Sequence, residues 1–162
     1  PTFEIIDMKL DNLLPVVSLN IKVAQETPLR ALILDKDDMW HIGSANIRSF
    51  GGGCSVASVA TGDSEASKYL GKIKSNLFEK ENINRLKASI YHPMETGLTF
   101  GNTEFFINKI LLKEGKKVLS EIQTYSTISE NPRFIFETKN KSKTFTIEFY
   151  DNDGNEFISK TK

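Results

Sequence analysis

The sequence contains a single cysteine and no excess of either charge, and both features narrow what it can do. Cys54 stands alone among 162 residues, so the chain can form neither an internal disulfide nor a metal site built from several cysteines. The 21 basic residues balance 21 acidic ones, which argues against a nucleic-acid-binding surface or a basic membrane anchor. We therefore expect neither nucleic acid nor a membrane as a partner.

Long apolar runs and the motifs of common enzyme classes are also missing. No stretch approaches the ~20 apolar residues of a transmembrane helix, and the first ten residues lack the pattern of a signal peptide. The sequence has no Gly-x-Gly-x-x-Gly, no phosphate-binding loop ending in Lys-Ser/Thr and no His-Glu-x-x-His. We expect no cofactor on these grounds.

The sequence does contain many short segments in which apolar and polar residues alternate, the pattern of half-buried β-strands. In the first third these segments are 3–9, 15–24, 29–35 and 39–50. In the last half they recur at a spacing of roughly 8–12 residues, which is typical of an antiparallel sandwich, and they are 85–93, 104–113, 118–125, 133–138, 143–150 and 156–161. The sequence predicts an all-β protein of two immunoglobulin-like antiparallel β-sandwich units. The first unit has fewer strands than the roughly seven of a complete sandwich.

The stretch between the two sets of strands has a different composition. Residues 55–84 are rich in small and polar side chains, and Asp63 or Ser64 suits the N-cap of a short helix. We interpret this stretch as a linker with at most one or two helical turns. The expected division is a β unit at 1–53, a cysteine loop and linker at 54–84, and a β-sandwich domain at 85–162.

The lone cysteine lies in the most glycine-rich stretch of the chain. Cys54 directly follows Gly51, Gly52 and Gly53 and precedes Ser55, so its neighbours are small and its backbone is conformationally free. One interpretation is an accessible thiol that bonds covalently to another molecule. The alternative is a turn whose glycines serve backbone geometry while a small cysteine fills a gap.

Two further stretches join predicted strands through turn residues. In "HPMETGL" (92–98) the proline ends a strand; His92 is a candidate base or hydrogen-bond donor toward a sulfur-bound oxyanion, and Met94 a candidate soft contact. The same stretch is equally a simple strand-ending turn. "STISENPRFIF" (126–136) is a turn that enters a strand.

Two enzyme-like or metal-binding alternatives use the same residues. Cys54 and His92 are the residue types of a nucleophile and its base, although the sequence suggests no third group to orient them. His41, Cys54, His92 and Met94 are the ligand types of a blue-copper site, but their order differs from the usual one, in which a histidine and the methionine closely follow the cysteine. His41 itself reads as an ordinary strand histidine.

Together these stretches resemble a known family. "GGGCSVAS" (51–58) resembles the carrier-cysteine segment of SoxY, and "HPMETGL" resembles the signature of SoxZ. "STISENPRFIF" followed by "DNDGNEF" (151–157) matches the rest of SoxZ in order and spacing. The chain therefore resembles the fused SoxYZ-like sulfur carriers, with a SoxY-like unit at 1–53 and a SoxZ-like domain at 85–162.

The resemblance implies a periplasmic sulfur carrier that is not itself an enzyme. Cys54 takes the place of the carrier cysteine, which holds sulfur intermediates as thiosulfonate or persulfide. Gly51, Gly52, Gly53 and Ser55 form its flexible arm, with His92 and Met94 as candidate neighbours. In SoxY the arm is a free C-terminal tail, whereas here the chain continues, so the arm is a tethered loop.

The implied partners are Sox-type loading, hydrolysing and oxidising enzymes, of the c-type cytochrome and sulfate-releasing hydrolase classes. An exposed Cys54 also allows a disulfide-linked homodimer, and a non-covalent homodimer is a further candidate. The alternative to a carrier is a non-catalytic β-sandwich module that binds a redox partner associated with a quinoprotein, with the cysteine incidental.

Overall fold

Residues 3–49, 68–98, 101 and 103–161 are described by the computed structural model, and their regular elements are strands β1 to β13. The predicted all-β class, with antiparallel sheets, is confirmed. The described residues contain no helix that is long and apolar enough to cross a membrane.

The chain divides into two compact units. The described residues of Pro1–Ile21 and Ala57–Lys162 form the first unit, and those of Lys22–Val56 form the second. The first boundary of the division expected from the sequence, after residue 53, falls among residues outside the described part and stays a prediction.

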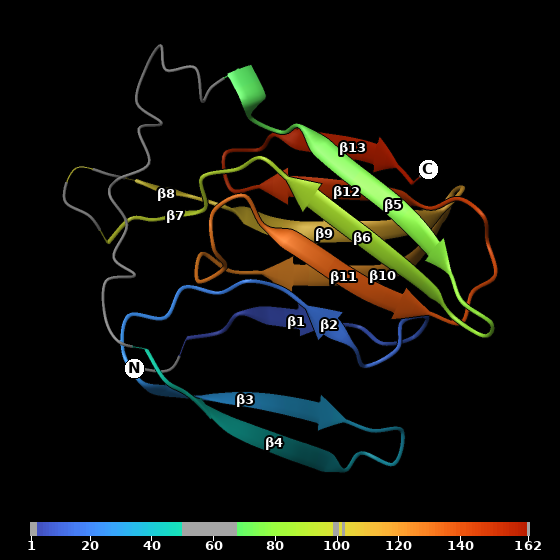
Figure 1. Cartoon of the computed structure of the whole chain (residues 1–162), viewed down its shortest axis with the longest axis horizontal. Helices are drawn as coiled ribbons and strands as arrows, with labels where there is room; N and C mark the ends of the chain where they lie inside the picture. The colour runs from blue at the N-terminus through green and yellow to red at the C-terminus, as the bar shows by residue number, and fades with distance from the viewer. Residues whose placement is uncertain (1–2, 50–67, 99–100, 102, 162) are drawn as a thin grey trace. The chain divides into compact units, whose positions relative to one another are not determined.

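The first unit is built on two antiparallel sheets (Figure 1). Sheet A has the strand order β1-β10-β9-β12-β13. Its strands are β1 (Ile6–Met8), β10 (Lys117–Thr124), β9 (Ile107–Glu114), β12 (Thr146–Asp151) and β13 (Glu156–Lys160). Sheet B has the order β2-β11-β6-β5. Its strands are β2 (Val17–Ser18), β11 (Arg133–Thr138), β6 (Asn84–Ile90) and β5 (Ile73–Glu79). A short ladder of β7 (Glu95–Thr96) and β8 (Glu104–Phe105) lies beyond the end of β6.

The core lies where the alternating patterns place it. Strand β6 directs Leu86, Ala88 and Ile90 inward, each no more than 2% exposed, as its alternation predicted. Strand β12 does the same with Ile147 and Phe149. The remaining fully buried large side chains come from the facing strands and the segments beside them, and they are Met94, Ile107, Ile110, Leu112, Leu119, Ile122, Phe134, Phe136 and Phe145.

The expected linker at 54–84 is corrected at its C-terminal end, since residues 73–79 form strand β5 at the edge of sheet B. Ser75 occupies an inward position of β5 and is 7% exposed. Its hydroxyl lies 2.8 Å from the Ser159 hydroxyl and donates to the Lys160 carbonyl at 3.1 Å. These bonds join the edges of the two sheets, so β5 is an integral part of the sandwich.

The expected strand at 15–24 is reduced to β2 and one isolated bridge between Ile21 and Ile128. Val17, which the alternation placed on a buried face, is 38% exposed. Its two-residue strand lies at the edge of sheet B, where only one neighbouring strand is available to pair with it.

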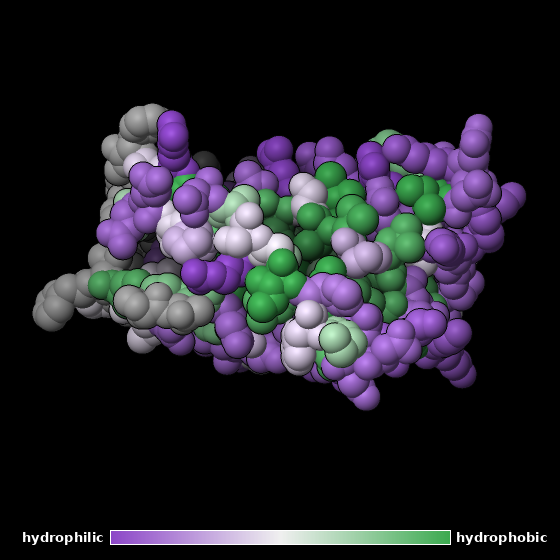
Figure 2. All heavy atoms as spheres, turned by 90° about the horizontal axis from the view of Figure 1, so that it is seen from below, coloured by the Kyte–Doolittle hydropathy of each residue, from purple (hydrophilic) through white to green (hydrophobic). Residues whose placement is uncertain are grey.

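The second unit is a hairpin of β3 (Thr27–Leu34) and β4 (Trp40–Ile47). An acidic turn joins the two strands: the Asp35 carboxylate accepts hydrogen bonds from the Asp37 and Met39 amides. Cross-strand partners such as Leu34 and Trp40 share a face, and both side chains are exposed. Figure 2 shows hydrophobic side chains gathered over the hairpin on the face turned to the viewer.

Candidate functional site

The proposed carrier segment lies outside the described residues. Gly51, Gly52, Gly53, Cys54 and Ser55 all belong to the range 50–67 that the structure does not describe. Their roles, and any contact of Cys54 with His92, stay predictions. The described site is therefore built from the SoxZ-like motifs.

His92 and Met94 lie in the segment that follows β6, and both are fully buried. The Met94 amide donates to His92 Nδ1 at 3.2 Å, so a neutral His92 ring carries its proton on Nε2. The Nε2 atom has no hydrogen-bond partner among the described residues. The nearest carboxylate oxygen is Asp151 Oδ2 at 3.5 Å, and that side chain is also fully buried.

The protonation state of His92 follows from this environment. Burial of the ring lowers its pKa from 6.5 to about 4, and the opposing attraction of the nearby Asp151 carboxylate is the weaker influence. The ring is thus neutral at pH 7. The Phe105 ring, whose centroid is 4.4 Å away, packs against it.

Met94 is a core residue. Its backbone adopts a left-handed conformation, with φ at 53°, and its sulfur accepts a hydrogen bond from the Ile107 amide at 3.4 Å. Both side chains are inaccessible to solvent in this structure, and their role as neighbours of the cysteine arm stays a prediction.

The second motif is bound directly to the first through Asn131. The Asn131 amide donates to the His92 carbonyl at 2.8 Å, and the Asn131 side-chain oxygen accepts from the His92 amide at 3.2 Å. Asn131 has a positive φ of 48°, a conformation that asparagine tolerates better than most residues. The turn in "STISENP" therefore binds the backbone of "HPMETGL" through these hydrogen bonds.

The third motif contributes Asp151, which the sequence treated only as part of a turn. Its Oδ1 atom accepts from the Asp153 and Asn155 amides at 3.0 and 2.8 Å, and its Oδ2 atom accepts from Asn155 Nδ2 at 2.8 Å. These bonds hold the carboxylate in place beside His92. We call His92, Met94, Asn131 and Asp151 the motif cluster; all three SoxZ-like motifs meet in it.

Gly71, just before β5, allows the close packing that supports the motif cluster. Gly71 has φ at 75°, and a Cβ atom placed on it would lie 2.1 Å from Phe157 Cδ1. Phe157 in turn packs edge-on against His92, with a centroid distance of 6.4 Å. Glycine is required at position 71 both for its conformation and for this close approach.

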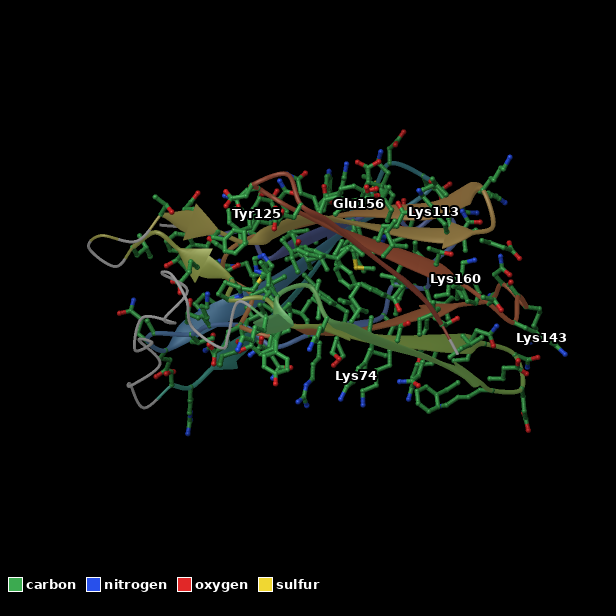
Figure 3. All side chains as sticks on the ribbon, turned by 90° about the horizontal axis from the view of Figure 1, so that it is seen from above. Lys74, Lys113, Tyr125, Lys143, Glu156 and Lys160 are labelled. Carbon is green, nitrogen blue, oxygen red and sulfur yellow. The ribbon has the colours of Figure 1, made fainter. Side chains whose placement is uncertain are left out.

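A second group of charged side chains lies on the outer face of sheet A, around Glu148. Lys113 Nζ is 2.6 Å from Glu148 Oε2, and the Tyr150 hydroxyl is 2.8 Å from a carboxylate oxygen of both Glu148 and Glu156. Burial acts to raise the pKa of Glu148, but the hydrogen bonds with Lys113 and Tyr150 lower it overall. Figure 3 shows Lys113 and Glu156 on the same side of the two layers, opposite Lys74. These charges pair with one another, which is typical of a solvated sheet face.

The copper alternative gains no support from the described residues. Among them no group of three or more His, Cys, Asp or Glu is placed to hold a metal ion. His41 belongs to the hairpin unit, is exposed, and lies 2.7 Å from the Asp35 carboxylate. Cys54, the central ligand of that hypothesis, is outside the described part.

Comparison with known families identifies the sandwich. The family model described as "Sulphur oxidation protein SoxZ" matches residues 73–162, more than half of the chain. The chain belongs to the SoxZ family. It is therefore a member of the Sox sulfur-oxidation system, in which SoxZ is a non-catalytic component. The match includes all three motifs of the motif cluster and begins at the first residue of β5. No curated protein matches the chain.

Proposed function

We propose that the chain is a fused SoxYZ-like carrier, in which Cys54 holds sulfur intermediates covalently and presents them to partner enzymes. The observation that carries this proposal is the order of two segments in one chain. A lone cysteine that follows three glycines precedes a domain of the SoxZ family. Thiolates are the nucleophilic form of cysteine, and small neighbours allow such a sulfur to enter a narrow active site.

The proposed chemistry is a cycle of reactions at the sulfur atom of Cys54. A partner of the c-type cytochrome class couples the thiol to thiosulfate: Cys–SH + S2O3²⁻ gives Cys–S–S–SO3⁻ + H⁺, and the two electrons released pass to the cytochrome. A hydrolase then adds water, so that Cys–S–S–SO3⁻ + H2O gives Cys–S–SH + SO4²⁻ + H⁺. An oxidising partner then accepts six electrons from the outer sulfur, so that Cys–S–SH + 3 H2O gives Cys–S–SO3⁻ + 7 H⁺. The hydrolase releases this group as sulfate: Cys–S–SO3⁻ + H2O gives Cys–SH + SO4²⁻ + H⁺. We place this cycle in the periplasm.

In this function the SoxZ domain supports the carrier segment and binds the partner enzymes. Its only buried histidine among the described residues, His92, is neutral at pH 7 and enclosed, so the domain offers no accessible base from the motif cluster. In the proposed cycle the catalytic steps belong to the partner enzymes. Each partner must release the carrier for the next step, so we expect binding of modest affinity.

The test is a mass measurement on the full chain after incubation with the loading enzymes and thiosulfate. We expect a mass increase of one S2O3 group on the native protein and none on Cys54→Ala. Ser55→Ala, which keeps the thiol, is the matched control and should load. An unchanged mass on the native protein would refute covalent carriage.

The runner-up function is an interaction module whose cysteine is incidental, favoured by the fact that Cys54 lies outside the SoxZ match. Thiol labelling separates the two functions. A carrier cysteine should react rapidly with a thiol reagent in the native protein. A reaction that is slow until denaturant is added would support the interaction module. Non-reducing electrophoresis of the same samples reports a disulfide-linked homodimer.

A further inference from the structure

The N-terminal segment, residues 3–21, contributes a strand to each sheet of the sandwich. Strand β1 pairs with β10 at the edge of sheet A, and β2 pairs with β11 at the edge of sheet B (Figure 1). This segment lies outside the residues matched by the SoxZ family model, whereas β10 and β11 lie inside them. The family domain thus accepts its outermost strands from a distant part of the sequence.

Backbone hydrogen bonds hold the N-terminal segment beyond its two short strands. The Leu14 amide donates to the Glu137 carbonyl at 2.8 Å, and the Asn20 carbonyl accepts from the Ser129 amide at 3.0 Å. These bonds satisfy polar groups at strand edges, which would otherwise be free to pair with another chain.

Side chains of the domain also reach the backbone of the segment. The Ser120 hydroxyl donates to the Lys9 carbonyl at 2.8 Å, and the Thr138 hydroxyl donates to the Asn12 carbonyl at 2.6 Å. Leu13 is 5% exposed and belongs to the hydrophobic core. Further apolar side chains of the segment pack against that core, and they are Ile5, Ile6, Met8, Leu10 and Leu19.

We propose that the edges of β10 and β11, with the core surface between them, form a binding surface for an extended strand, and that residues 3–21 are its ligand whether or not they are covalently joined to the domain. The contacts between residues 3–21 and the domain are spread along the whole segment, and they involve backbone atoms as well as side chains. Lys22–Val56, the chain that follows the segment, forms a compact unit of its own.

The experiment cuts the full chain between the ligand and the rest. Ala24 and Gln25 are exposed and follow the segment, so a specific protease site is inserted between them. After cleavage we expect the N-terminal fragment to elute together with the remainder in native size-exclusion chromatography. A labelled synthetic peptide of residues 3–21 should then exchange into the cut protein. If the fragment elutes separately, or the peptide does not bind, the surface is not a strand-binding site.

Two variants and a control identify the contacts. Leu13→Ala in the cut protein should weaken retention of the fragment by roughly tenfold or more, because it removes a buried side chain. Ser120→Ala removes one hydrogen bond to the segment and should weaken retention less; it keeps the test valid if Leu13→Ala disturbs folding. Val16→Ala, at a position 44% exposed, should retain the fragment fully. Equal retention in all three variants contradicts the proposed surface.

Discussion

The burial of His92 makes a specific prediction about acid stability. The folded protein has a His92 pKa of about 4, against 6.5 for an unperturbed histidine. Between these values the unfolded chain binds a proton that the folded chain does not, so the free energy of unfolding falls as the pH falls from 6.5 toward 4. At pH 7 nearly all of the stability that the neutral His92 ring contributes is present. It is lost as the pH falls from 6.5 to about 4.

The magnitude follows from the two pKa values. Each pKa unit corresponds to about 1.4 kcal/mol, so titration of His92 should lower the free energy of unfolding by about 2 kcal/mol between pH 7 and pH 5. His92→Gln lacks the titrating group and should show a shallower pH dependence, although it is less stable at pH 7 because ring packing is lost. Carboxylates distant from His92 contribute equally to both proteins and cancel in the comparison.

The assay is urea unfolding at a series of pH values, with equal slopes of unfolding as the check on two-state behaviour. The chain has only one other histidine, His41, which is exposed. His41→Gln is therefore the control, and it should retain the steep pH dependence of the native protein. If His92→Gln and the native protein lose the same stability between pH 7 and pH 5, the reasoning about the buried ring is refuted.

Two further predictions concern packing. Gly71→Ala should destabilise the protein by several times the ~1 kcal/mol typical of glycine changes, because the added methyl group meets the Phe157 ring; Gly115→Ala, also at positive φ but with nothing near its Cβ position, should cost much less, and chemical denaturation measures both. Phe134→Ala should cost about 3–5 kcal/mol in the same assay because the ring is fully buried, whereas Phe78→Ala, 49% exposed, should cost under about 1 kcal/mol.

Most of the fold could be predicted from the sequence because its strands have regular alternation. The β6 pattern and the β12 pattern give the correct inward faces without any further information. Strand β5 was missed because its inward positions are Ile73, Ser75 and Leu77, and the central serine interrupts the apolar alternation. Ser75 is tolerated there only through its bonds to the β13 backbone and Ser159, a partner 84 residues away that local patterns do not reveal.

The sequence predicted each of the three motifs of the candidate site, but it did not predict that they meet in the folded chain. The turn character of the three motifs was visible in Pro93, Pro132 and Gly154. Their meeting was not, because His92 follows β6 of sheet B and Asp151 ends β12 of sheet A, so the two residues come together only in the packed sandwich. Asp151 therefore looked like an ordinary turn aspartate. The one available signal was that all three motifs end or begin a strand.

The geometry of the motif cluster bears on what the SoxZ motifs mean. The hydrogen bonds described in the cluster are internal: Asn131 holds the His92 backbone, and the Asp151 carboxylate is fixed by its own turn beside the ring, whose Nε2 atom has no hydrogen-bond partner among the described residues. A buried polar group whose hydrogen bonds are internal specifies a fold and does not offer a reactive surface. The motifs are therefore requirements of the sandwich. Cys54, the only thiol in the sequence, is the residue on which the carrier proposal stands or falls.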